Sequence, residues 1–197
     1  MKNSLFRPRS TALIGLILLA AFSRLLPLPP NFAPITAMAL FGAAYFDRKR
    51  LVFLVPLGAM VLSDLTMEIL FHKYQVADWG GLPLLGVVYG TFALIAGLAI
   101  WLRRHVRPLV VMCAAPVGSI LFFLITNFAA WALTDDMPSP FGYPKTWAGL
   151  FECYVMGLPF FKWTLLGDVT FSAALFGSWA ILTNTVPALQ EPSPEPA

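Results

Sequence analysis

Long apolar runs separated by short connections constrain the fold of this chain more than any other feature. About 20 consecutive apolar residues form a helix that is long enough to cross the hydrocarbon core of a bilayer. The sequence has 197 residues, of which 58% are hydrophobic and 12% are charged, a composition typical of integral membrane proteins. Its 17 prolines are spread through the apolar runs and disfavour the alternating strands of a membrane barrel. We therefore expect an all-α integral membrane protein.

The apolar runs predict a bundle of six transmembrane helices. The second run is short, so we expect its helix to begin within the membrane or to follow a loop that folds back over the bundle. An amphipathic stretch, TWAGLFECYVMGL, precedes the sixth span and is predicted to form a lid or a wall. The predicted spans are residues 11–29, 33–46, 51–71, 84–102, 108–133 and 159–183. The expected division of the chain is a cytoplasmic segment at 1–10, the six-helix domain at 11–183 and a disordered cytoplasmic tail at 184–197.

The basic residues set the expected orientation. Lysine and arginine accumulate in the cytoplasmic connections of membrane proteins. Here they cluster before the first span and after the second and fourth spans, so both termini are expected in the cytoplasm. Because the basic residues form short clusters between apolar runs, the lipid bilayer is the expected partner and a nucleic acid is not. The clusters are Lys2, Arg7 and Arg9, then residues 48–50, then Arg103, Arg104 and Arg107, against Arg24, Lys73 and Lys145 on the opposite side.

The sequence carries no motif of a known catalytic site. It has no phosphate-binding loop, no GxSxG or HExxH pattern and no dinucleotide-binding glycine pattern. Cys113 and Cys153 both lie in apolar surroundings, without the spacing of a zinc site or a disulfide framework. The N-terminal run has the basic start of a signal peptide, but it lacks a small-x-small cleavage site before Pro27 and is predicted to be a retained span. We expect no enzyme, no catalytic residue, no cofactor and no metal ligand.

Two carboxylates in the outer half of the third span are the first candidates for a binding site. Asp64 and Glu68 lie four residues apart in LSDLTMEIL, which places them on one face of a helix. Charged side chains are costly within a bilayer and usually face the interior of the bundle. They either pair with a cation or hydrogen-bond donors to hold the helices together, or they face a bound solute.

Three polar residues of the fifth and sixth spans are expected at a similar depth. Asn127 lies near the outer end of the fifth span, and Lys162 and Asp168 lie in FFKWTLLGD at the start of the sixth. Six residues correspond to about 9 Å along a helix and about 120° around it, so Lys162 and Asp168 do not form a pair within one helix. Lys162 either reaches the membrane surface or faces the cavity. Asp168 is deeper and is expected to meet a partner on another helix or to be protonated.

Four segments of the spans resemble a known family. They are NFAPITAMALFGAAYF in the second span, PLGAMVLSDL in the third, SILFFLITNFAAW in the fifth and GLPFFKWTLLGDVTFSAALFG in the last. From residue 27 to residue 177 the chain resembles uncharacterised six-span bacterial membrane proteins that are similar to the substrate-binding S components of energy-coupling factor (ECF) vitamin transporters. The resemblance implies an outward-facing pocket closed by connections near residues 30–34, 72–83 and 134–154, which adds Asn31 to the candidates. It also implies a place in the bacterial cytoplasmic (inner) membrane and docking on an ECF coupling subunit with ATPases.

We therefore expect a membrane uptake protein that binds a small micronutrient. Asp64, Glu68, Asn127, Lys162, Asp168 and Asn31 are the expected substrate-binding residues. Because the carboxylates outnumber the lysine, a cationic or metal-containing solute would balance the charge better than an anionic one, and a vitamin-like solute is the other expectation. Two alternatives stay open. The chain is either a non-transporting subunit of a larger complex, with its polar residues joining helices, or a membrane enzyme that acts on a lipid or small molecule with Asp64 or Asp168 as acid or base.

Overall fold

A computed structural model describes residues 8–71, 81–103, 110, 113–134 and 142–190 of the chain. Helices account for the regular structure of these residues, and no strand occurs among them, which confirms the all-α prediction. Five helices, counting α1 with η1, are long and apolar enough to cross a membrane. The helices are α1 (Pro8–Phe22), α2 (Ile35–Tyr45), α3 (Lys49–Phe71), α4 (Gly81–Arg103), α6 (Ala115–Leu133) and α7 (Trp147–Thr185), with 3-10 turns η1 (Ser23–Leu25) and η2 (Pro187–Leu189).

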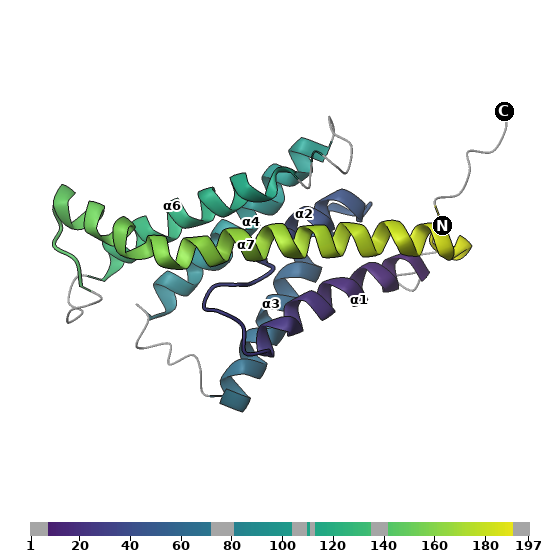
Figure 1. Ribbon diagram of the computed structural model, residues 1–197, viewed down its shortest axis with the longest axis horizontal. Helices are drawn as coiled ribbons and strands as arrows, with labels where there is room; N and C mark the ends of the chain where they lie inside the picture. Colours follow the sequence, from purple (N-terminus) through teal and green to yellow (C-terminus); the bar gives the residue numbers. More distant parts are fainter. Residues whose placement is uncertain (1–7, 72–80, 104–109, 111–112, 135–141, 191–197) are drawn as a thin grey trace.

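The short helix α2 lies at the centre of the bundle (Figure 1). It contacts α1, α3, α4, α6 and α7, and every residue from Thr36 to Ala43 is buried. A helix that is apolar on all sides needs such a surrounding. Its 11 residues extend about 16 Å, roughly half the thickness of a hydrocarbon core. The prediction of a short second helix is confirmed, and α2 cannot cross a bilayer alone.

A proline-rich connection, residues 26–34, leads from η1 to the start of α2, and we call it the strap. It runs from the end of α1 into the middle of the bundle (Figure 1). Within the strap, the Phe32 amide donates to the Pro29 carbonyl at 3.0 Å, and Asn31 has a positive φ of 66°. Because Pro30 at the second position of this turn fixes a negative φ, the turn is of type II, and asparagine tolerates its third position. The sequence PPNF thus determines a tight turn that presents Asn31.

The strap lies directly against the backbone of α7. A Cβ atom added at Gly167 would come within 2.9 Å of the Ala33 amide nitrogen and 3.2 Å of the Ala33 carbonyl oxygen. The absence of a side chain at Gly167 therefore permits the close approach of the two segments. This contact fixes the depth at which the strap enters the bundle and α2 begins.

Helix α7 corrects the prediction of a separate amphipathic stretch before the last span. The two segments form one helix of 39 residues with Pro159 in its interior, and the ribbon changes direction within its first third (Figure 1). Proline removes one helical hydrogen bond and bends a helix without necessarily ending it. The first part of α7 is held on α6, since the Tyr154 hydroxyl donates to the Leu124 carbonyl at 2.8 Å. It is therefore part of the wall of the bundle.

The ends of the helical domain also differ from the expected boundaries. Helix α1 already begins at Pro8, inside the predicted cytoplasmic segment. At the other end, α7 continues to Thr185, and Leu189 of η2 packs into the hydrophobic core. The Gln190 side chain donates to the Thr183 carbonyl at 3.0 Å. The structure is thus ordered through residue 190, and only residues 191–197 of the predicted tail lie outside the described residues.

Candidate functional site

Asp168 of α7 caps the buried start of α2. Its side chain is fully buried, and Oδ1 accepts from the backbone amides of Thr36 at 2.9 Å and Ala37 at 3.3 Å. Oδ2 accepts from the Ser119 hydroxyl of α6 at 2.7 Å. The first amides of a helix lack partners within the helix, and a carboxylate there also complements the helix dipole. Asp168 meets partners on other helices, as one reading of the sequence anticipated, and it joins α7, α2 and α6.

The opposite end of α2 is capped by a cation. The Arg103 guanidinium of α4 donates to the carbonyls of Ala43 at 3.2 Å and Phe46. A positive charge at a helix C-terminus complements the helix dipole. Charged side chains of neighbouring helices therefore pair with backbone amides at the start of α2 and with backbone carbonyls at its end.

Asp64 belongs to a polar cluster that joins three elements. Its Oδ1 lies 2.6 Å from Nη1 of Arg24 in η1, and its Oδ2 accepts from the Tyr89 hydroxyl of α4 at 2.6 Å. Arg24 also donates to the Ser63 hydroxyl at 2.7 Å. These contacts match the interpretation of Asp64 as a residue that pairs with a cation and donors between helices.

Glu68 and Lys162 are both more accessible than the fully buried Asp168. Glu68 is half-buried one turn beyond Asp64 on α3. Lys162 is exposed, and its ammonium lies 5.2 Å from the centre of the Trp163 ring. Such a cation–π contact is typical of lysine at a membrane interface. Asp64, Lys162 and Asp168 therefore have different partners.

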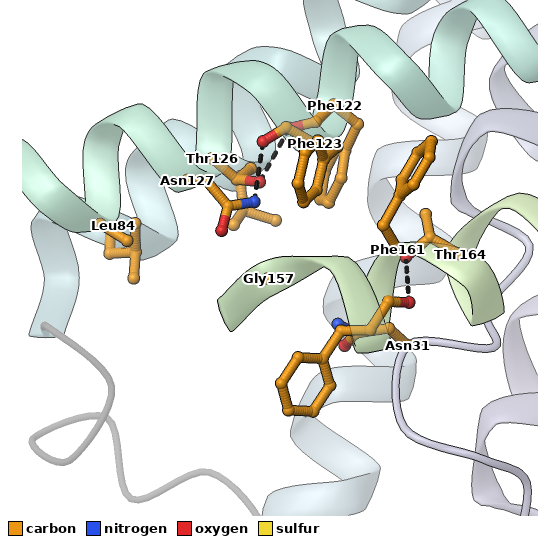
Figure 2. A pocket seen from close by; sticks show the side chains of 12 residues that line it. Asn31, Leu84, Phe122, Phe123, Thr126, Asn127, Gly157, Phe161 and Thr164 are labelled. Atoms are coloured by element: carbon orange, nitrogen blue, oxygen red, sulfur yellow. Dashed lines mark hydrogen bonds between the residues drawn. The ribbon is translucent and has the colours of Figure 1, made fainter. Parts of the chain in front are cut away.

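A cavity of about 190 Å³ lies between α4, α6, α7 and the strap (Figure 2). Asn31 and Asn127, both predicted from the sequence, are among its lining residues, whereas Asp64, Glu68, Lys162 and Asp168 are not. None of the lining residues, which all belong to the described part of the chain, is charged. The lining consists of Asn31, Leu84, Val88, Phe122, Phe123, Thr126, Asn127, Ala130, Gly157, Phe160, Phe161 and Thr164.

The polar groups of the cavity are oriented by their own helices. The Thr126 hydroxyl donates to the Phe122 carbonyl at 2.8 Å, and the Asn127 Nδ2 donates to the Phe123 carbonyl at 2.8 Å. On α7, the Thr164 hydroxyl donates to the Phe160 carbonyl at 3.3 Å (Figure 2). A hydroxyl has one proton and two lone pairs. Both threonine oxygens therefore retain the capacity to accept a hydrogen bond.

Gly157 makes room for the Asn127 amide. A Cβ atom at position 157 would lie 2.9 Å from Cε2 of Phe123 and 3.1 Å from Cγ of Asn127, and it would overlap Oδ1. Figure 2 shows the Asn127 side chain directed toward the α7 ribbon at Gly157. Beside it, the rings of Phe123 and Phe161 have centroids 4.7 Å apart and are tilted by 39°. The cavity thus combines aromatic walls with an amide held between α6 and α7.

Several residues of these sites are not among the predicted candidates. Arg24 was assigned to an outer connection, and only the fold brings it to Asp64. Gly157 and the phenylalanines belong to runs that are apolar throughout, so no pattern distinguishes a cavity face from a lipid face. The sequence feature that could have indicated the cavity is the pair Thr126 and Thr164, two polar residues at the depth of Asn127.

Of the connections expected to close the pocket, residues 72–80 and 135–141 lie outside the described part of the chain.

Comparison with known proteins identifies a family for nearly the whole chain. Residues 4–189 match the model of a family described as a family of unknown function, DUF6580. No curated protein and no solved structure matches the chain. The matched range includes every helix described above and all the residues that line the cavity. The chain therefore belongs to the DUF6580 family, whose function is unknown.

Proposed function

We propose that this protein is a multi-pass uptake protein of the bacterial cytoplasmic membrane that holds a small micronutrient in the cavity between α4, α6, α7 and the strap. The observation that carries the proposal is the lining of this cavity, which is mainly aromatic and aliphatic with a few oriented polar groups. Small-molecule sites generally have this composition.

The proposed topology has six crossings with both termini in the cytoplasm. In this topology the strap and α2 together make the second crossing. Arg9 lies over the Trp179 ring, and Arg103 lies at the end of α2, so these cations gather at one end of the bundle. Thr164 precedes Trp179 by about 22 Å along the axis of α7. If the basic end is cytoplasmic, the cavity belongs to the outer half of the protein.

The resemblance to ECF S components supports the same location. It implies an outward pocket closed in part by the first connection, and Asn31 of the strap lines the cavity. The coupling subunit and ATPases of such transporters are the proposed partners, because the sequence contains no ATP-binding motif of its own.

The position of the carboxylates changes the expected cargo. The sequence favoured a cationic or metal-containing solute because Asp64, Glu68 and Asp168 were assigned to the pocket. Asp64 is paired with Arg24, and Asp168 caps α2. The cavity itself is lined by uncharged residues in the described part of the chain. An uncharged, vitamin-like solute is therefore the better match.

The test is the identity of any small molecule that purifies with the protein. Protein in lipid nanodiscs is extracted and analysed by mass spectrometry, in parallel with the variants Gly157→Ala and Gly177→Ala. Both glycines lie on α7, but a Cβ atom at Gly177 has no neighbour within 4 Å. We expect a solute retained by the wild type and by Gly177→Ala and lost from Gly157→Ala, and we expect the wild type to take it up in cells. A stoichiometric large partner without any bound solute would instead establish a non-transporting subunit.

A further inference from the structure

The chemistry of the cavity restricts the class of solute that it can hold. We infer that the solute is a single planar ring, uncharged, that donates hydrogen bonds through one small substituent. This inference rests on the proposed function, since it concerns the same cavity. Size, wall chemistry, hydrogen-bonding capacity and charge each contribute one part of it.

The volume suits a solute of one substituted ring. The cavity measures about 190 Å³. An engineered cavity of about 150 Å³ in another protein binds benzene. The additional volume accommodates one small substituent on such a ring.

The walls favour a planar solute. Phenylalanines from both α6 and α7 line the cavity, and Phe123 and Phe161 contact one another in a tilted geometry at 4.7 Å between centroids. Aromatic rings prefer offset and edge-to-face contacts with one another. A flat ring placed beside Phe123 and Phe161 can make offset or edge-to-face contacts with these two rings.

The polar side chains require a hydrogen-bond donor. The hydroxyl protons of Thr126 and Thr164 are directed to carbonyls of their own helices, which leaves their oxygens as acceptors. The Asn127 amide nitrogen donates one of its two protons to its own helix, and its Oδ1 adds another acceptor, so acceptors outnumber the remaining donor on these three side chains. The Asn31 amide, which can donate and accept, also lines the cavity. A solute without a donor would leave these oxygens without a partner on displacing water, at a cost in free energy.

The charge distribution excludes an ion. Among the residues that the structure describes, no cation or carboxylate lines the cavity. The charged residues nearest to the lining in the sequence point elsewhere: Lys162 is exposed with its ammonium 5.2 Å from the centre of the Trp163 ring, and Asp168 is engaged by the amides of α2. Transfer of an unpaired ion from water to such surroundings is strongly unfavourable. An uncharged donor such as a primary amide or an amino group meets all these conditions.

Four probes of the same shape test this inference. Benzamide is uncharged and donates, benzoate is an anion, benzamidine is a cation that donates, and acetophenone is uncharged without a donor. All four contain the same number of non-hydrogen atoms. Equilibrium dialysis measures their binding to the full chain in nanodiscs, with protein-free nanodiscs as the blank and with Gly157→Ala and Gly177→Ala in parallel.

We expect benzamide to bind at least about tenfold more tightly than benzoate and benzamidine, and about fivefold more tightly than acetophenone, as one hydrogen bond predicts. Its binding should disappear in Gly157→Ala and persist in Gly177→Ala. Equal or tighter binding of either ion or of acetophenone, or no site-dependent binding of benzamide, overturns the assigned class. If a retained or transported solute is nevertheless lost in Gly157→Ala, the proposed function stands without this class. If neither the probes nor a retained solute depend on Gly157, both fail.

Discussion

Asp168 provides the sharpest test of how this fold is held together. Replacing it with alanine leaves the backbone amides of Thr36 and Ala37 without an acceptor in a fully buried position. Each buried polar group left without a partner costs about 1–3 kcal/mol. For the two amides, Asp168→Ala should therefore lower the free energy of unfolding by about 2–6 kcal/mol.

Asparagine at the same position separates hydrogen bonding from charge. Its Oδ1 can still accept from both amides, and its Nδ2 can donate to the Ser119 hydroxyl. The Ser119 proton can then go to the Ala115 carbonyl, which lies 3.0 Å from its oxygen. The remaining loss is the interaction of a negative charge with the start of α2, at most about 2 kcal/mol. Asp168→Asn should therefore be clearly milder than Asp168→Ala.

The assay is unfolding of the purified protein in mixed micelles with increasing SDS, followed by circular dichroism. Asp47→Asn is the control, because the Asp47 side chain is 84% exposed and lies 4.0 Å from Arg103, and loss of such an exposed ion pair should stay within about 1 kcal/mol. The reasoning is refuted if Asp168→Ala unfolds like the wild type, or if Asp168→Asn is as destabilising as Asp168→Ala. Folded Asp168→Asn should also retain the bound solute, because Asp168 does not line the cavity.

Three further sets of substitutions test the other contacts in the same unfolding assay. Arg24→Met should cost about 1–3 kcal/mol, between the values for exposed and buried ion pairs, because the side chains of the Arg24–Asp64 pair are 10% and 18% exposed. Adding Asp64→Leu should recover most of this loss, and a purely additive double variant would contradict the pairing. Gly177→Ala should stabilise α7 by up to about 1 kcal/mol through helix propensity, whereas Gly157→Ala should destabilise by about 1–3 kcal/mol through overlap with the cavity wall; equal effects would refute that packing. Arg103→Ala should cost about 1.5–3 kcal/mol by removing the charged donor from the end of α2, with partial recovery in Arg103→Lys, and full stability of the alanine variant would show that this cap is dispensable.

The candidate site was only partly predictable. An asparagine in an apolar run lowers stability unless its amide finds hydrogen-bond partners, so the sequence singles out Asn127. The structure places Asn127 at the cavity. Asp64 and Asp168 stood out for the same reason, yet the structure places them between helices. Sequence reasoning identifies that such a group must have a partner, but it does not distinguish a bound solute from a helix terminus or an arginine. The fold brings Asp168 to Thr36, 132 residues away along the chain.

The sequence by itself determined the class of the protein, the approximate positions of its apolar helices and the short length of the second one, because helix length and bilayer thickness are directly comparable. Only the tertiary structure decided that α2 lies at the centre, that α7 continues through Pro159, and which polar residues meet. The physical reason is that lipid and protein interior are equally apolar to a side chain. Ile17 is fully buried, whereas Leu19 is 71% exposed on the same helix. Without a polar face to mark the outside, the periodicity that orients helices in water carries little information here, and packing sets the orientation of each helix.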